Sequence, residues 1–159
     1  MKIESLMTHD VLTCRPDDKL TEVARIMWEN DCGCVPVVDP AQRVVGMVTD
    51  RDVCMAAYMQ GQRLEDGVVA NVMSRDVRSC RSTDDLRKAE STMRAEKLHR
   101  LPVVNESGKL VGLLSINDIA CEAARRSSST DRQVTFEEVG ATLAAICEHR
   151  RADGHGEKV

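Results

Sequence analysis

Residues 35–52, VPVVDPAQRVVGMVTDRD, and residues 101–118, LPVVNESGKLVGLLSIND, follow one pattern, and this repetition decides the fold. The match extends outward without a gap, so that residues 7–57 align with residues 73–123 at an offset of 66 positions. A repeat of this length indicates one supersecondary unit that is used twice. Two such units can pack about a pseudo-twofold axis and form two equivalent clefts. Polar residues that occur in both copies are therefore the most informative ones.

Each copy predicts the same order of elements, β-α-β-β-α. In the first copy these are a short strand at 11–14, a helix over 20–27 capped by residues 16–18, strands at 35–38 and 44–49, and a second helix from residue 50. Helical spacing of apolar residues supports the helix, and β-branched runs support the strands. The second copy repeats these elements 66 positions later. Pro36 and Pro102 are expected near a strand start or an edge, because proline has no N–H to donate.

The predicted fold class is α+β, with two repeats packed about a pseudo-twofold axis and a helix after them. The predicted boundaries are 1–60 for the first repeat, 61–72 for a linker and the start of the second repeat, and 73–126 for the second repeat. Residues 127–159 are predicted as a flexible linker, a helix and a tail. Each repeat is marginal in size, so the two halves are expected to share a core.

The final helix lies outside the repeat. Residues 135–138, Thr-Phe-Glu-Glu, form a capping-box pattern at its start. The apolar stripe that follows consists of Phe136, Val139, Leu143, Ile146 and Cys147. Three roles stay open for this helix: it caps the repeats, extends a contact between two copies, or docks a partner.

Composition and charge exclude several classes of function. The net charge of −4 gives no basic footprint for nucleic acid, and an aromatic content of 2% argues against a base-stacking platform. No apolar run is long enough to span a membrane and the N-terminus has no signal-peptide pattern, so a cytoplasmic protein is expected. The four histidines show no nucleophile–base pattern and no Walker-type loop occurs, so we expect no enzyme.

The sharpest signal is a motif that occurs in both copies. It combines a glycine in a strand, a hydroxyl residue at the strand end and an aspartate in the first turn of the next helix. The two sets are Gly46, Thr49 and Asp52, and Gly112, Ser115 and Asp118. A helix N-terminus suits a phosphate, and a carboxylate can accept two hydrogen bonds from the diol of a ribose. The same residue types also cap helices without any ligand, so both interpretations stay open.

On the basis of these repeated residues, the chain resembles a tandem pair of CBS domains, a Bateman module, over about residues 1–126. The resemblance rests on the duplicated β-α-β-β-α unit, on the two Pro-Val-Val strands and on the two Gly-x-x-Thr/Ser-x-x-Asp motifs. It implies a regulatory module without an obligatory cofactor. The family binds AMP, ADP, ATP, S-adenosylmethionine, other adenosine compounds and sometimes metals.

The resemblance also implies roles for particular residues. Asp52 and Asp118 match the aspartates that bind ribose, and Thr49 and Ser115 match residues that contact phosphate or ribose. Thr13 matches a position that lines the cleft for base and ribose. So does Ser79. The residues implied to hold the base through backbone groups are Cys32, Gly33 and Cys34 in the first copy, and Leu98, His99 and Arg100 in the second.

The two implied sites are not equal. Arg100 aligns with Cys34, so only the second copy offers a guanidinium there, and arginine binds phosphate well. Conversely, Arg51 aligns with Asn117 of the second copy. We therefore predict that one site binds its ligand more tightly. Arg100 can instead pair with a neighbouring acid, and His99 can instead have a surface or core role.

Seven cysteines are present: Cys14, Cys32, Cys34, Cys54, Cys80, Cys121 and Cys147. Their odd number argues against a disulfide framework in a reducing compartment. Small buried hydrophobic residues are the ordinary role of free cysteines. The alternative is a zinc-binding or redox-responsive site in which Cys14, Cys32, Cys34 and Cys80 lie near one axis.

Trp28 aligns with Arg94 of the second copy, so its side chain is expected to face outward. An exposed tryptophan indicates a contact with another chain, unless the ring only covers its own helix. The resemblance implies homodimers of the paired repeats, with Trp28, Met27 and Met93 at the interface. The leading hypothesis is an adenine-nucleotide sensor that signals to an unknown effector protein. The alternative is a stress-related zinc or redox module that uses the cysteines.

Overall fold

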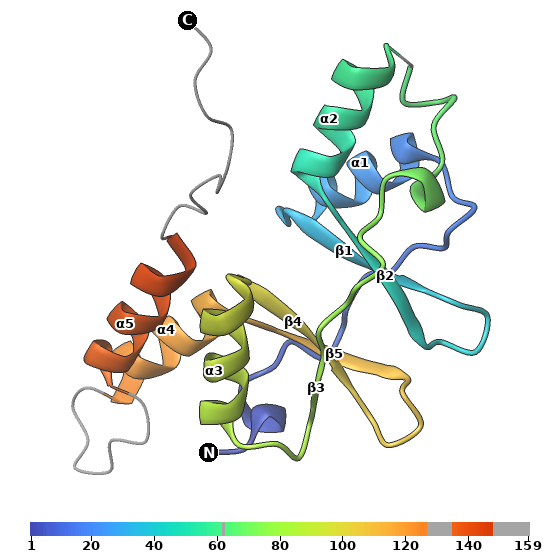
Figure 1. The fold of residues 1–159 in the computed structure, drawn as a ribbon. Coiled ribbons are helices and arrows are strands. Elements are labelled where there is room, and N and C mark those ends of the chain that lie inside the picture. The colour runs from blue at the N-terminus through green and yellow to red at the C-terminus, as the bar shows by residue number, and fades with distance from the viewer. Residues whose placement is uncertain (62, 127–134, 148–159) are drawn as a thin grey trace, which may run out of the picture.

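The computed structural model describes residues 1–61, 63–126 and 135–147. The first repeat contains α1 Leu20–Glu29, β1 Cys34–Val38, β2 Val44–Thr49 and α2 Asp50–Gln60. The second contains β3 Cys80–Arg81, α3 Leu86–Glu96, β4 Arg100–Val104, β5 Leu110–Ser115 and α4 Ile116–Arg126. Short 3₁₀ helices, Ile3–Ser5 and Val69–Asn71, precede the repeats, and α5 Phe136–Cys147 follows them. The predicted α+β fold with two repeats and a C-terminal helix is confirmed (Figure 1).

The two sheets have the same register. In the first repeat β1 pairs with β2 in antiparallel fashion and Pro36 lies opposite Met47. In the second, β4 pairs with β5 and Pro102 lies opposite Leu113. Both pairs shift register between the last two residues of the first strand. The tips of the two hairpins also meet, where the amide of Leu110 donates to the carbonyl of Gln42 at 3.0 Å.

The predicted first strands are mostly wrong. Only Cys14 forms a bridge, parallel to Val37, and β3 contains just two residues. Val38 donates its amide to Cys14 at 2.9 Å, and Cys14 donates to the Pro36 carbonyl at 3.1 Å. The next ladder bond toward the N-terminus would need an amide on Pro36, which proline lacks. Proline therefore stands in the middle of β1, not at its start, and ends the parallel ladder there.

The predicted helix caps are also corrected. The residue before α1 is Lys19, which makes no side-chain cap, while Asp18 instead accepts the amide of Arg15 at 2.7 Å. Helix α3 is capped by Asp85, one residue later than expected, through the amide of Arg87 at 3.0 Å. Asp18 thus stabilises the turn ahead of the helix instead of the helix itself.

The two halves exchange their leading segments. Thr8 pairs with Leu113 of the second repeat, and Ser74 pairs with Met47 of the first, each through two backbone hydrogen bonds of 2.9 to 3.0 Å. Two glycines make this approach possible, because a Cβ on Gly46 would lie 2.6 Å from the sulfur of Met73. The strand glycine of the repeated motif therefore makes room for the other repeat's leading segment.

Because of this exchange, the molecule has two cores where a shared one was expected. Ile3 and Met7 pack into the core of the second repeat, whereas Val69 and Met73 pack into the core of the first. Each repeat thus depends on residues that precede the other one in sequence. The boundary predicted at residues 61–72 stays a prediction, although Val69 is fully buried in the first core.

Helix α5 packs on α3 and α4 of the second repeat (Figure 1). The predicted capping box is confirmed, since Thr135 and Glu138 exchange hydrogen bonds of 2.9 to 3.2 Å. The residues that α5 buries are Val139, Thr142 and Ile146. The predicted stripe is partly wrong, because Phe136 and Leu143 are exposed. The predicted linker at 127–131 and the tail at 152–159 lie outside the described residues.

Helices long and apolar enough to cross a membrane are absent from the described part of the chain.

Candidate functional site

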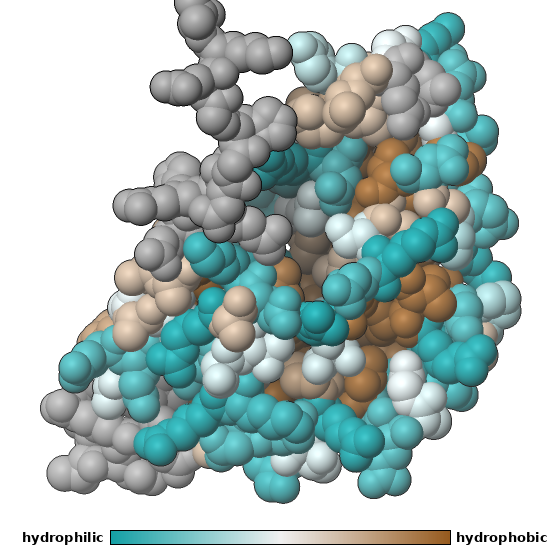
Figure 2. All heavy atoms as spheres, viewed as in Figure 1, coloured by the Kyte–Doolittle hydropathy of each residue, from teal (hydrophilic) through white to brown (hydrophobic). Residues whose placement is uncertain are grey.

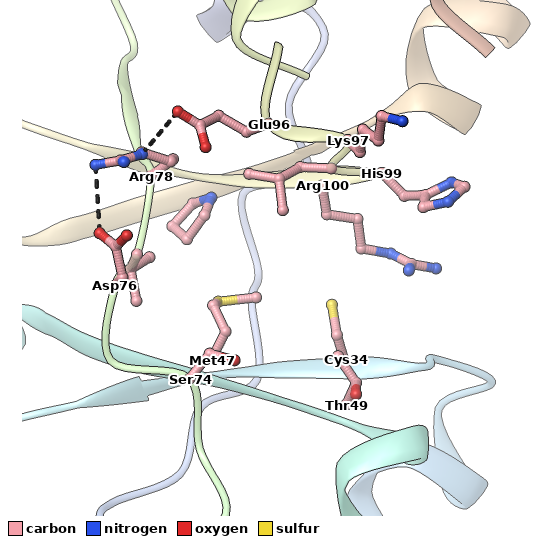
Figure 3. Close-up of a pocket in the computed structure, with 13 residues that line it drawn as sticks. Cys34, Met47, Thr49, Ser74, Asp76, Arg78, Glu96, Lys97, His99 and Arg100 are labelled. Atoms are coloured by element: carbon pink, nitrogen blue, oxygen red, sulfur yellow. Dashed lines mark hydrogen bonds and ion pairs between the residues drawn. The ribbon is translucent and has the colours of Figure 1, made fainter. Parts of the chain in front are cut away.

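A pocket with a volume of about 390 Å³ lies between the two repeats, in the range typical of small-molecule sites, about 300 to 1,000 Å³. The first repeat contributes Cys34, Met47 and Thr49 from its sheet. The second contributes its leading segment, the end of α3 and the start of β4. These residues are Ser74, Asp76, Val77, Arg78, Glu96, Lys97, Leu98, His99, Arg100 and Pro102. Figure 3 shows the first repeat's strands on one side of the space and β4 on the other.

One wall of the pocket carries a chain of ion pairs. Arg78 contacts Glu96 at 3.1 Å and Asp76 at 3.3 Å, as Figure 3 shows. These contacts fix the leading segment of the second repeat to the end of α3. The equivalent residues of the first repeat are Leu12, Asn30 and Asp10, which cannot form the same chain. The pocket therefore has a wall that its counterpart across the pseudo-twofold lacks.

The opposite end of the pocket is rich in positive charge. Helix α3 ends at Lys97, which adopts a left-handed backbone with φ 54° and turns the chain toward β4. Figure 3 shows the side chains of Lys97, His99 and Arg100 at this end. Among the described residues, Arg100 forms no ion pair. Its half-buried guanidinium is thus available to an anion.

Cys34 lies across the pocket from Arg100 and is buried. Burial raises the pKa of the Cys34 thiol, although the positive charge of Arg100 acts in the opposite direction. The thiol is therefore neutral at physiological pH and presents a small apolar surface to the pocket. Cys34 and Arg100 occupy equivalent positions in the two repeats, so the pseudo-twofold axis brings the two unequal residues face to face.

The aspartates of the repeated motif form capping boxes. Oδ2 of Asp52 accepts the amide of Thr49 at 2.8 Å and its hydroxyl at 2.7 Å, and the Thr49 hydroxyl accepts the amide of Asp52 at 3.2 Å. Ser115 and Asp118 repeat this arrangement at 2.7, 2.7 and 3.2 Å. No described residue donates a hydrogen bond to Oδ1 of either aspartate. One oxygen of each carboxylate thus stabilises the helix, and the other can accept a ligand hydroxyl.

The structure brings together five of the predicted site residues: Cys34, Thr49, Leu98, His99 and Arg100. Cys32 and Gly33 line hollows on the side of α1 instead. Thr13 and Ser79 lie just before the residues that pair with β1 and β4, and Asn117 is exposed in the first turn of α4. Ser115 and Asp118 take part in the second capping box. Asp52 is not among the residues that line the pocket, but it accepts a hydrogen bond from the hydroxyl of Thr49, which does line it. The ligand roles of all these residues stay predictions.

Sequence reasoning missed the leading segment of the second repeat. Ser74 and Asp76, which precede the predicted strand, line the pocket, and so does Arg78 within it, although none of the three was predicted as a site residue. One signal could have found them, because Asp76 is the same residue type as Asp10 of the first copy. The structure also shows that Thr49 and Arg100, from different repeats, line one pocket.

The four thiols of the proposed metal alternative are not gathered. Cys14 lies in the first core and its thiol donates to the carbonyl of Pro36 at 3.9 Å, whereas Cys80 lies in the second core and its thiol donates to the carbonyl of Pro102 at 3.8 Å. Burial raises the pKa of both thiols to about 12, so neither is a ready thiolate. In residues 1–61, 63–126 and 135–147, no group of three or more His, Cys, Asp or Glu side chains could hold a metal ion. The expectation of four thiols near one axis is wrong.

Comparison with known proteins gives a consistent result. The model of the CBS domain family matches the chain twice, over residues 3–58 and 69–124. The CBS domain-containing protein YhcV of Bacillus subtilis is 31% identical over 129 residues, which cover 80% of this chain and 89% of YhcV. The inosine-5'-monophosphate dehydrogenase of Methanocaldococcus jannaschii is 31% identical over 120 residues, but this chain spans only 23% of that enzyme.

Among solved structures, the chain is similar to CBSX2 in complex with AMP. The two are 25% identical with a TM-score of 0.69, over 78% of this chain and 96% of the other.

Proposed function

The chain belongs to the CBS domain family, and we propose that it is a regulatory module that binds an adenine nucleotide in the pocket between its repeats. AMP, ADP and ATP are the candidate ligands, with a related adenosyl compound as the wider class. CBSX2, a similar domain pair, binds AMP in its solved structure. The similarity to a dehydrogenase covers only part of that enzyme, which fits a regulatory role and not a catalytic one.

The observation that carries the proposal is the distribution of charge in the pocket. A nucleotide has a neutral base at one end and a phosphate at the other. The end with Lys97, His99 and Arg100 suits the phosphate, because a guanidinium can form two parallel hydrogen bonds to it. The apolar surfaces of Met47 and Pro102 suit a base. The free Oδ1 of Asp52, beside Thr49, suits a ribose hydroxyl.

The asymmetry between the repeats supports unequal affinity. The pocket described above combines Arg100 with the ion-paired wall of Arg78. Across the pseudo-twofold, Leu12 replaces Arg78 and Gly33 replaces His99. We therefore expect the pocket with Thr49 and Asp52 to bind first and the equivalent one, with Ser115 and Asp118, to bind more weakly.

The signal would leave the module through a change of shape or of protein contacts. Thr49 caps α2, and Lys97 ends α3, so a ligand that touches both connects helices of the two repeats. A homodimer, with Trp28 in its interface, and a separate effector protein are the proposed recipients. Met27 and Met93, which were expected at the interface, are buried in the two cores. A cytoplasmic location, where adenine nucleotides occur, fits this role.

The test is thermal unfolding of the metal-free protein with AMP, ADP, ATP, S-adenosylmethionine and zinc in parallel. A ligand at 100 times its dissociation constant adds about 2.7 kcal/mol to the free energy of unfolding, which raises Tm by several degrees. We expect a shift with at least one adenine nucleotide that Arg100→Ala and Asp52→Ala reduce. A shift with zinc alone would overturn the proposal.

A further inference from the structure

Helix α5 is an addition to the second repeat and covers apolar surface of that repeat. It packs on α3 and α4 (Figure 1), where Ile119 of α4 is buried in one core with Val139 of α5. By the repeat, Ile119 corresponds to Val53 of the first copy. Val53 lines a groove of about 410 Å³ beside Trp28, which is 88% exposed. The same apolar face is therefore covered by a helix in one repeat and forms a surface groove in the other.

The contact between α3 and α5 encloses a carboxyl group. Glu90 of α3 is only 3% exposed, and its Oε1 has no hydrogen-bond partner among the described residues. Charged side chains ordinarily reach solvent, and Figure 2 shows hydrophilic residues, in teal, over much of the surface in the lower half of the view, where α3 lies. The equivalent of Glu90 in the first repeat is Ala24. The repeated unit itself thus needs no acid at this position.

The charges around Glu90 offset its burial only in part. Burial is the largest cause that raises its pKa, the two acids near it raise the pKa further, and the two arginines lower it. These groups, from α3, its cap and α5, are Arg94, Arg87, Asp85 and Glu138. Both arginines are exposed, so water screens their charge. On α4, the buried Glu122 is paired with Arg125 at 3.2 Å. Ionised Glu90 is therefore poorly compensated.

Glu138, the acid on α5, has a separate task in its own helix. Its Oε2 accepts the amide and the hydroxyl of Thr135 at 2.9 and 3.0 Å, which caps α5. Arg87 lies 3.9 Å from its Oε1. Both oxygens of Glu138 thus have a donor or a cation nearby, whereas Oε1 of Glu90 has no donor. Of the two acids, Glu90 is therefore the one that takes up a proton when α5 is packed.

We propose that α5 is a pH-sensitive cover of the face formed by α3 and α4, and that a proton on Glu90 keeps this cover closed. Protonated Glu90 is uncharged, so neither its burial nor the charge of Glu138 opposes the packing of α5. Loss of the proton leaves a buried charge without a partner, and α5 opens more often because water then reaches that charge. Val139, Thr142 and Ile146 hold α5 in the core at every pH, so the closed state stays the main one.

The direction of the pH effect follows from the two states of the cover. In the open state Glu90 is in water and has the ordinary pKa of a glutamate, whereas the pKa is raised in the closed state. The equilibrium constant for opening is therefore low and constant in acid, below the ordinary pKa. It rises by up to about tenfold per pH unit between the two pKa values and is constant again above them. This device goes beyond the proposed function, because it does not depend on whether a nucleotide binds.

Hydrogen exchange of the full chain without nucleotide, at several values from about pH 4 to pH 8, measures this constant for the amides of α5 after correction for intrinsic exchange rates. We expect it to rise at least about tenfold across the window, and to exceed the constant for β4 and β5 at each pH. Glu90→Gln replaces the carboxyl with an uncharged group of the same shape. In this variant the constant should stay at its acid value throughout.

Glu137→Gln is the matched control, because it removes an exposed acid from the first turn of α5 and should leave the rise intact. A constant that does not change with pH in the unmodified chain would overturn the proposal. So would a rise that persists in Glu90→Gln, or one that Glu137→Gln also abolishes. If α5 exchanges only together with β4 and β5, it does not open separately and is no cover.

A second measurement needs no variant and therefore does not depend on the folding of Glu90→Gln. The side-chain carboxyl carbons of the unmodified, ¹³C-labelled protein are followed by NMR as the pH is raised. We expect the carboxyl of Glu90 to titrate above the range of the exposed glutamates such as Glu137. A titration of Glu90 within that range contradicts the proposal, because the closed cover would then hold no proton.

Discussion

The two repeats have the same register in their sheets and the same capping boxes, yet their surroundings differ. The second repeat has a pocket wall of ion pairs at Arg78, a free guanidinium at Arg100 and a covering helix on its outer face. The first has a thiol at Cys34 and an uncovered groove beside Trp28. The two copies thus share one scaffold and differ in the side chains and the helix that surround it.

What unites the repeats is the exchange of their leading segments. Because Ile3 completes the second core and Val69 the first, neither repeat is independent of the other. Backbone pairs such as Ser74 with Met47 also join the two repeats directly. The proposed regulatory pocket therefore lies between two halves that are joined through both their cores and their backbones.

The largest effect is expected from breaking this exchange. Ile3 is fully buried in the core of the second repeat, so Ile3→Ala should lower the free energy of unfolding by about 2 to 5 kcal/mol. Hydrogen exchange should show the loss of protection first in β4 and β5, although Ile3 precedes the first repeat. Val69→Ala should give the reverse pattern. An equal loss in both sheets would contradict the two-core description.

The second largest effect is expected from removing the positive charge that Arg100 brings to the pocket and that its counterpart Cys34 lacks. Arg100→Ala should weaken binding of the preferred nucleotide by about 10- to 100-fold, because a charge-assisted hydrogen bond is lost. Cys34→Ala, at the equivalent position of the first repeat, should change affinity by less than about threefold. Isothermal titration calorimetry measures both. Equal losses in the two variants would show that the asymmetry does not govern binding.

The close approach at the strand glycines differs slightly between the repeats. A Cβ on Gly112 would lie 2.9 Å from the backbone oxygen of Thr8, against 3.2 Å from that of Ser74 for Gly46. Gly112→Ala should therefore cost more than Gly46→Ala, about 1 to 3 kcal/mol, measured by denaturant unfolding. Gly140→Ala is the control, since nothing lies near that position, and it should stabilise the protein. The reverse order of the two glycines would contradict the geometry.

The two capping boxes should contribute equally to the free energy of unfolding. Asp52→Ala and Asp118→Ala should each lower the free energy of unfolding by about 1 kcal/mol, because their hydrogen bonds have nearly the same lengths. Only their effects on nucleotide binding should differ, with Asp52 the more important for the described pocket. Binding that neither variant changes would leave these aspartates as helix caps alone.

The smallest effect is expected from Glu90, which is buried on α3 near Glu138 of α5. The pKa of Glu90 is raised in the folded protein, so the native state holds a proton that the unfolded chain has lost, and stability falls as pH rises through this window above the ordinary pKa. Glu90→Gln should therefore stabilise the protein by about 0.5 to 1 kcal/mol at neutral pH. The gain should vanish in acid, below the ordinary pKa of a glutamate. If the stability gained by Glu90→Gln does not depend on pH, better packing is its cause. The charges of Arg87, Arg94 and Glu138 around Glu90 would then play no part in it.

The sequence by itself determined the repeated unit, the two Pro-Val-Val strands, the motif with Thr49 and Asp52, and the outward position of Trp28. These are local or periodic features, and the same pattern in two copies makes them reliable. The capping box at Thr135 and Glu138 belongs to the same class, because it depends only on residues three positions apart.

Only the tertiary structure decided the partners of these elements. That Ile3 serves the second core, that Asp76 and Arg78 form a pocket wall, and that Thr49 and Arg100 meet across the axis depend on contacts between distant segments. The predicted first strand is mostly absent for a related reason. Pro36 has no amide to donate to the segment before Cys14, which lies some twenty positions earlier in the sequence. Pairing of distant groups depends on three-dimensional register, and periodicity along one chain does not encode it.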